Sequence, residues 1–135
     1  MKFSVRPFIL VAALLLVVPI AQAQDSPGPF DDFANHYKCY EVFEFDNFDP
    51  REVRLRDQFG LSHDQVIRPR YLCNPVSKNF EPIPHPEVHL VCFEIIEESE
   101  PREVKVLVRN QFGEQTLKVQ QPELLCLPSS KEHVE

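Results

Sequence analysis

Two histidine–cysteine pairs are the side chains whose types and spacing most directly suggest chemistry. His36 stands three residues before Cys39, and His89 stands three residues before Cys92. Imidazole nitrogens and thiolates are common zinc ligands, so the four side chains together could build a two-His, two-Cys metal site. The same thiols would pair with each other in an oxidising compartment. The chemistry open to these residues therefore depends on where the chain is sent.

The N-terminus has the pattern of a secretory signal peptide over residues 1–23. A positively charged start precedes the apolar residues 8–18, and residues 21–23 read Ala-Gln-Ala, the small-x-small pattern of a cleavage site. The apolar stretch is too short to span a bilayer core of roughly 30 Å. We expect cleavage after this segment, a flexible stretch over residues 24–35 and a secreted or periplasmic product. An uncleaved membrane anchor is the alternative.

Composition argues against several classes of function. The formal net charge is −7, and acids outnumber bases, so nucleic acid and anionic membrane surfaces are not expected partners. With only three glycines, a glycine-rich phosphate loop is not expected, and neither a serine nucleophile elbow nor a metalloprotease helix motif occurs. An enzyme would need a site assembled from distant residues. We predict a protein that is not an enzyme and binds no cofactor.

All four cysteines follow the predicted cleavage site, so two disulfides are expected. The separation between Cys39 and Cys73 equals that between Cys92 and Cys126, which favours these two pairs as bridges made inside a repeated unit. Each bridge would close a loop of about 35 residues and contribute roughly 3–4 kcal/mol. The exchanged pairing, Cys39 with Cys126 and Cys73 with Cys92, stays open if the repeats swap strands.

The chain repeats itself with a shift of 53 positions. RDQFG at 56–60 returns as RNQFG at 109–113, and HYKCYEV at 36–42 returns as HLVCFEI at 89–95. Self-similarity of this strength indicates a duplicated structural unit. The repeat predicts these boundaries: a single domain over residues 36–132, with one repeat over 36–79, a second over 89–132 and a proline-rich crossover over 80–88.

The hydrophobic pattern indicates strands. Val53 and Leu55 alternate with polar residues, and Val104, Val106 and Val108 of the second repeat alternate mostly with polar residues. Thirteen prolines leave little room for helix. Neither repeat alone would bury enough apolar surface to fold, so we expect the two to shield each other. The predicted fold is all-β: a pseudo-two-fold, duplicated β-sandwich or small barrel of six to eight strands, stapled by disulfides.

The repeated phrase is interpreted as a turn signature. Asp57 and Asn110 hold equivalent positions before Gln-Phe-Gly, and an Asx residue beside a turn commonly accepts hydrogen bonds from the backbone of that turn. An acid/base role is the alternative, but the amide of Asn110 cannot act as a base at neutral pH. The predicted turn residues are Asp57, Gln58, Phe59, Gly60, Asn110, Gln111, Phe112 and Gly113.

The ordered motifs HxxCYEV, DQFG, RPxxLCxPVxKN, HLVCFEI, NQFG and PELLCxPS resemble an uncharacterised domain family of exported bacterial proteins. The resemblance covers residues 36–131. It implies that the domain occurs in larger envelope proteins, often in several copies per chain. It implies no activity, substrate or catalytic residue.

An aromatic stretch is the candidate for partner binding. Tyr40, Phe43, Phe45 and Phe48 lie among acidic residues, and an apolar patch rimmed by acids would suit a protein or peptide partner, or a strand added at a sheet edge. The alternative is that some of these rings pack inside the domain.

We therefore predict a non-catalytic exported module that makes protein–protein or cell-envelope contacts, with no stable membrane insertion after signal cleavage. One alternative is a metal-binding or hydrolytic protein that uses His36, His89 and the cysteines. Another is a secreted inhibitor, although no reactive loop is recognisable in the sequence.

Overall fold

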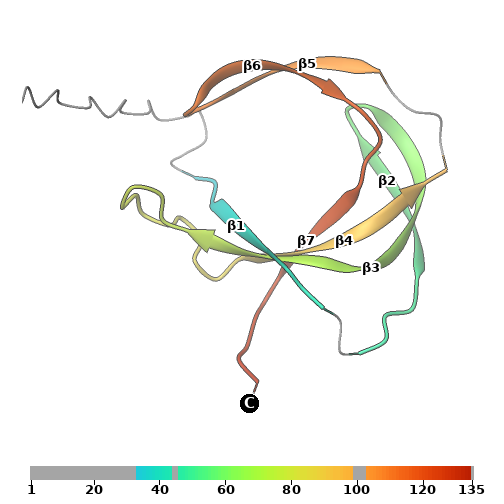
Figure 1. Ribbon diagram of the computed structural model, residues 1–135, viewed down its shortest axis with the longest axis horizontal. Coiled ribbons are helices and arrows are strands. Elements are labelled where there is room, and N and C mark those ends of the chain that lie inside the picture. Colours follow the sequence, from blue (N-terminus) through green and yellow to red (C-terminus); the bar gives the residue numbers. More distant parts are fainter. Residues whose placement is uncertain (1–32, 44–45, 99–102, 135) are drawn as a thin grey trace, which may run out of the picture.

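A computed structural model describes residues 33–43, 46–98 and 103–134 of the chain (Figure 1). These residues form seven strands in two sheets, without helix, which confirms the all-β prediction and the expected number of strands. None of the described segments is a helix long and apolar enough to cross a membrane. The predicted signal peptide (1–23) and residues 24–32 of the predicted flexible stretch lie outside the described residues.

The first repeat contributes three strands and the second contributes four, because the long third strand of the first repeat corresponds to two strands in the second. Their bounds are β1 (His36–Glu41), β2 (Arg51–Asp57), β3 (Gly60–Val76), β4 (His89–Glu97), β5 (Val104–Asn110), β6 (Gly113–Val119) and β7 (Leu124–Ser129).

The larger sheet is organised around β3. One edge of β3 pairs with β2 along its N-terminal half and with β1 along its C-terminal half, and its other edge pairs with β4. β4 in turn pairs with β7, so the order across the sheet is β1-β3-β4-β7. All of these pairs are antiparallel. β5 and β6 form a separate two-stranded sheet.

The two repeats share one internal design. In each, the first strand pairs with the last, and the segment between them makes a hairpin. The backbone N–H of Val42 donates to the carbonyl of Arg70 at 3.0 Å, and the equivalent N–H of Ile95 donates to the carbonyl of Glu123 at 3.0 Å. The duplication seen in the sequence is thus a duplication of hydrogen-bonding register.

The relation between the repeats differs from the predicted two-fold packing. β1 and its equivalent β4 are both antiparallel to β3, so they run in the same direction. The first and last strands of the two repeats therefore follow one another across the larger sheet. The edge of β3 carries backbone donors and acceptors that need partners, and the first strand of the second repeat supplies them. The described strands do not close into a barrel, because β5–β6 stays outside the larger sheet.

The core lies at the junction of β3 and β4. Val66, Cys73, Cys92 and Ile95 are its most buried apolar residues, each no more than 6% exposed. The disulfides are Cys39–Cys73 and Cys92–Cys126, which confirms the favoured pairing. Because the Sγ atoms of Cys73 and Cys92 are 3.8 Å apart, the four sulfurs form a row across β1, β3, β4 and β7.

The two hairpin turns are built alike. Asp57 Oδ1 accepts a hydrogen bond from the N–H of Phe59 at 2.7 Å, and Asn110 Oδ1 accepts one from the N–H of Phe112 at 2.8 Å. The next residue in each repeat is a glycine with positive φ, +131° at Gly60 and +112° at Gly113. An acid and an amide thus make the same bond, as expected for a side chain that shapes a turn.

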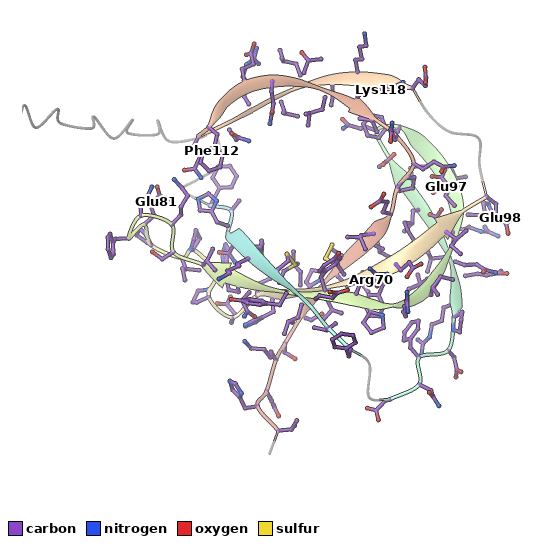
Figure 2. The ribbon with its side chains drawn as sticks, viewed as in Figure 1. Arg70, Glu81, Glu97, Glu98, Phe112 and Lys118 are labelled. Atoms are coloured by element: carbon purple, nitrogen blue, oxygen red, sulfur yellow. A yellow bond between two sulfur atoms is a disulfide. The ribbon has the colours of Figure 1, made fainter. Side chains whose placement is uncertain are left out.

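The second repeat departs from the first between its last two strands. β3 runs through 17 residues, whereas the equivalent stretch is interrupted at residues 120–123, between β6 and β7. The β5–β6 hairpin therefore leaves the larger sheet and arches towards the start of β1 (Figure 1). There Gln111 Nε2 lies 3.4 Å from His36 Nε2. Figure 2 places Phe112 at the same end of the molecule as Glu81.

Equal substitutions in the two turns should have unequal effects. Gly60→Ala should lower the free energy of unfolding by about 1–3 kcal/mol, because an L residue is strained at this φ and the turn belongs to the larger sheet. A Cβ atom at either glycine would have no other atom within 4 Å, so each substitution tests backbone strain without a steric clash. Gly113→Ala should change global unfolding much less, because it loosens a separate hairpin. Urea unfolding followed by circular dichroism measures both; equal losses would contradict the two-sheet arrangement.

Candidate binding cleft between the repeats

A cleft of about 440 Å³ lies where the hairpin of the first repeat faces the segment that leads into β7. It therefore exists only because two repeats are present. The lining residues come from β2 and β3, from the end of β4 and from the β6–β7 segment: Leu55, Arg56, Asp57, Phe59, Ser62, Asp64, Ile95, Glu97, Val119, Gln120, Gln121, Pro122, Leu124 and Leu125.

Strand alternation gives the cleft its apolar walls. Leu55 on β2 lies opposite Ser62 on β3, so both project from the same face of the sheet. Phe59, in the turn that follows, and the buried Ile95 on β4 add to this wall. Leu124 of β7, 40% exposed, lines the opposite side. The cleft thus presents aliphatic and aromatic surface from both repeats.

One carboxylate is buried in the cleft without full compensation. Asp64 is only 3% exposed, and Ser62 Oγ donates to its Oδ2 at 2.8 Å. Its Oδ1 has no hydrogen-bond partner among the described residues. A buried carboxylate oxygen without a donor is costly, and such a group calls for an explanation.

The strand register adds a second unfavourable feature to the environment of Asp64. Asp64 lies directly opposite Glu97 on β4, and like charges at opposite positions destabilise a strand pair. In the second repeat, the equivalent residue is Leu117, because Val53 pairs with Asp64 as Val106 pairs with Leu117. The second repeat thus has an apolar residue at the equivalent position, where Leu117 is 43% exposed on the separate hairpin. Figure 2 shows Glu97 on the side of the molecule where β3 and β4 approach the β6–β7 segment.

These features define the ligand chemistry of the cleft. The cleft lining holds three carboxylates, those of Asp57, Asp64 and Glu97, and one guanidinium, that of Arg56. This excess of negative charge beside apolar walls favours a cationic hydrogen-bond donor carried on an apolar stem, which describes a lysine or arginine side chain. Within the part of the chain that the structure describes, no three His, Cys, Asp or Glu side chains gather closely enough to hold a metal ion.

An ion cluster joins β3 to β4 next to the cleft. Glu94 Oε2 lies 2.9 Å from Arg68 Nε and 3.3 Å from Arg70 Nη1. The hydrogen bond from Arg68, aided by the charges of both arginines, lowers the pKa of Glu94 despite some desolvation. Desolvation of Arg70 is outweighed by its hydrogen bonds to Glu94 and Tyr71, and the pKa of Arg70 is raised. Glu94 and Arg70 are therefore both charged at neutral pH.

The contribution of this cluster to stability should disappear in acid. Because the pKa of Glu94 in the folded protein is below its ordinary value of 4.5, its contribution is complete above pH 4.5 and is lost as the pH falls through the lowered pKa. Glu94→Gln should therefore lower Tm at pH 7, and the difference from the parent protein should vanish in acid. Calorimetry across this range measures it, with Glu132→Gln in the C-terminal tail as control. A difference that persists in acid would contradict the assignment.

The predicted aromatic patch does not form one surface. Phe43 is 87% exposed and Tyr40 is 46% exposed, both on or just after β1. Phe48 instead packs against Phe93, with ring centroids 5.2 Å apart. Phe45 lies outside the described residues. Of the predicted binding residues that are described, only the two rings near β1 face solvent.

The histidine–cysteine pattern does not assemble a zinc site. His36 Nε2 lies 3.3 Å from Glu81 Oε2, and His89 Nδ1 lies 3.1 Å from the carbonyl oxygen of Glu87. The histidines begin β1 and β4, which lie on opposite sides of β3. All four cysteines are in disulfides, so no thiolate is present to bind a metal.

A thiol assay tests this oxidised state. The purified chain, denatured without reductant, should show no free thiols, because both bridges are formed. Four thiols with bound zinc would contradict the disulfide assignment. Peptide mapping of the oxidised chain should recover only the disulfides Cys39–Cys73 and Cys92–Cys126.

The repeated Gln-Phe-Gly phrase separates into two environments. Phe59 is half-buried and lines the cleft, whereas Phe112 is 74% exposed at the tip of the outer hairpin. Gln58 is exposed, and Gln111 lies beside His36. The sequence interpretation missed Asp64. Its signal was an acid at an inward strand position where the other repeat has Leu117.

Comparison with known proteins places the chain in a family. Residues 4–131 match a family described as a repeat of unknown function (DUF7450), and the chain belongs to it. No curated protein and no solved structure matches the chain.

Proposed function

We propose that this member of the repeat family is an exported, non-enzymatic protein-binding module whose cleft receives a basic side chain of a partner, flanked by apolar residues. The observation that carries the proposal is the buried Asp64, whose Oδ1 lacks a donor inside the cleft. A bound lysine or arginine would supply that donor. Its positive charge would also offset the repulsion between the two acids, Asp64 and Glu97, that lie opposite each other on β3 and β4.

The size and composition of the cleft support a peptide side chain as ligand. Its volume of about 440 Å³ lies in the range of small-ligand sites, and its open walls would also admit the backbone of an extended segment. Leu55, Phe59 and Leu124 would contact apolar neighbours of the basic residue. Specificity would come from the charge-assisted bond to Asp64, because apolar contacts discriminate weakly between sequences.

Export is supported by the chemistry of the cysteines. Two disulfides persist in an oxidising compartment, which agrees with the secretory signal expected over residues 1–23. The proposed partner is accordingly a protein of the cell envelope or the extracellular medium. A secreted inhibitor would be one form of such binding.

The test uses defined peptides and the disulfide-intact chain. Short acetylated peptides with a central Lys, Arg, Gln or Glu between Val and Leu are titrated against the protein by fluorescence anisotropy. The Lys and Arg peptides should bind at least tenfold more tightly than the Glu peptide, because only a cation pairs with Asp64. Asp64→Asn, which keeps the side-chain shape, should remove most of that difference.

Glu87→Gln, in the crossover, removes one charge outside the cleft and is the matched control. It should retain the preference for basic peptides, because general electrostatic attraction alone is screened and small. Equal affinity for Lys and Glu peptides, or an unchanged preference in Asp64→Asn, would refute the proposed function.

A further inference from the structure

The two outer strands of the larger sheet, β1 and β7, are the repeat equivalents of the two strands paired at its centre, β4 and the C-terminal half of β3. β1 pairs only with β3, and β7 pairs only with β4, so each has one unpaired edge among the described residues. β1 is the equivalent of β4, and β7 is the equivalent of the C-terminal half of β3. Among the described residues, each outer edge of the larger sheet is therefore a strand equivalent to one of the two strands paired at its centre.

Burial shows what these edges lack. At the central junction, Cys73 is 1% exposed and Cys92 is 4% exposed. Their equivalents, Cys126 on β7 and Cys39 on β1, are both exposed. Each disulfide thus has one covered and one uncovered half, and the uncovered halves are those at which a further strand would lie.

The interruption of the second repeat points to the same missing neighbour. Residues 67–70 continue β3 through two register shifts, with β4 paired alongside. The equivalent residues 120–123 have no strand on that side and are not part of a strand. Pro69 lies within β3, whereas its equivalent Pro122 lies in the break between β6 and β7. A flanking strand therefore decides whether this stretch stays extended.

We propose that a second copy of this chain docks the free edge of its β1 on the free edge of β7 and so reproduces the β3–β4 junction between molecules. The internal register pairs Tyr71 with Cys92 and Leu72 with Val91. Shifted to the equivalent residues, it places Leu124 opposite Cys39 of the second copy and Leu125 opposite Lys38 of the second copy.

This contact joins different edges of the two copies, so it is head-to-tail. A head-to-tail contact leaves one free β1 edge and one free β7 edge at the ends, and it can therefore continue beyond a dimer. The proposed contact forms through backbone hydrogen bonds between two strand edges, so it does not depend on a ligand bound in the cleft.

Charge makes the intermolecular junction weaker than the internal one. At the centre, Glu94 is held by Arg68 and Arg70. The equivalent of Glu94 is Glu41, while the equivalents of the two arginines are Gln121 and Glu123, neither of them basic. Glu123 would therefore face Glu41 of the second copy, whose Oε1 lies 3.9 Å from Arg70 Nη2 of its own chain. No basic residue of β7 would add to that ion pair, and the extra acid would keep the association reversible.

This mismatch provides a gain-of-function test. Glu123→Arg should tighten self-association about fivefold, because a like-charge contact becomes an opposite-charge contact like that between Arg70 and Glu94. Adding Glu41→Gln, which removes the acidic partner without placing a second cation beside Arg70, should cancel most of the gain. Glu132→Arg makes the same charge change in the C-terminal tail and should have less effect. Sedimentation equilibrium of the disulfide-intact chain over a wide concentration range measures each variant.

Cross-linking tests the register directly. Lys38→Cys and Leu125→Cys chains, mixed and treated with a short bis-maleimide, should give a mixed dimer, because these positions lie opposite each other in the proposed contact. Neither chain alone should cross-link efficiently. A Lys105→Cys chain, with its thiol on β5 of the outer hairpin, should not cross-link to Leu125→Cys.

We expect the average molar mass from sedimentation equilibrium to rise above that of a dimer at high concentration. We also expect the cross-link between positions 38 and 125 to form. A chain that stays monomeric at all concentrations, in the parent and in Glu123→Arg, would overturn the inference. A closed dimer linked between two Leu125→Cys chains would overturn it as well, because it would join two β7 edges symmetrically.

Discussion

The backbone pairing of β3 with β4 is the contact on which the rest of the structure depends. It connects the last strand of one repeat to the first strand of the next, and the most buried apolar residues gather around it. The flanking disulfides tie β1 and β7 to the two strands of this junction. Few side chains are fully buried among the described residues. A small hydrophobic core stabilises a fold weakly, so covalent cross-links and the hydrogen-bond ladder contribute much of the stability.

The same pairing explains why equivalent segments behave differently. β3 has strands on both edges and stays extended through Pro69, whereas the second repeat breaks at residues 120–123 and frees its hairpin. That break directs the β6–β7 segment across the first hairpin, and the cleft with Asp64 lies between them. The cleft proposed as a binding site thus arises from an asymmetry between two otherwise similar units, and β7, which follows the break, has the free edge of the proposed contact between copies.

The duplication, the strands, the disulfide pairs and the all-β class could be predicted from the sequence because each has a local signal in spacing or alternation. How the repeats adjoin could not, since alternation reports which residues share a face and not which edges meet. Phe48 packs on Phe93 rather than joining Phe43 in solvent, and no pattern along the chain distinguishes these rings. Asp64 lies opposite Glu97 only once β3 and β4 are paired, so its environment is a property of the tertiary fold.

The most direct test of this account is the set of cross-strand nuclear Overhauser effects between β3 and β4 in the oxidised chain. The account predicts contacts that link Val66 to Ile95 and Leu72 to Val91, alongside those of β1 with β3 and of β4 with β7. If β1–β3 and β4–β7 contacts appear while β3–β4 contacts are missing, the repeats do not share a sheet, and the account is wrong.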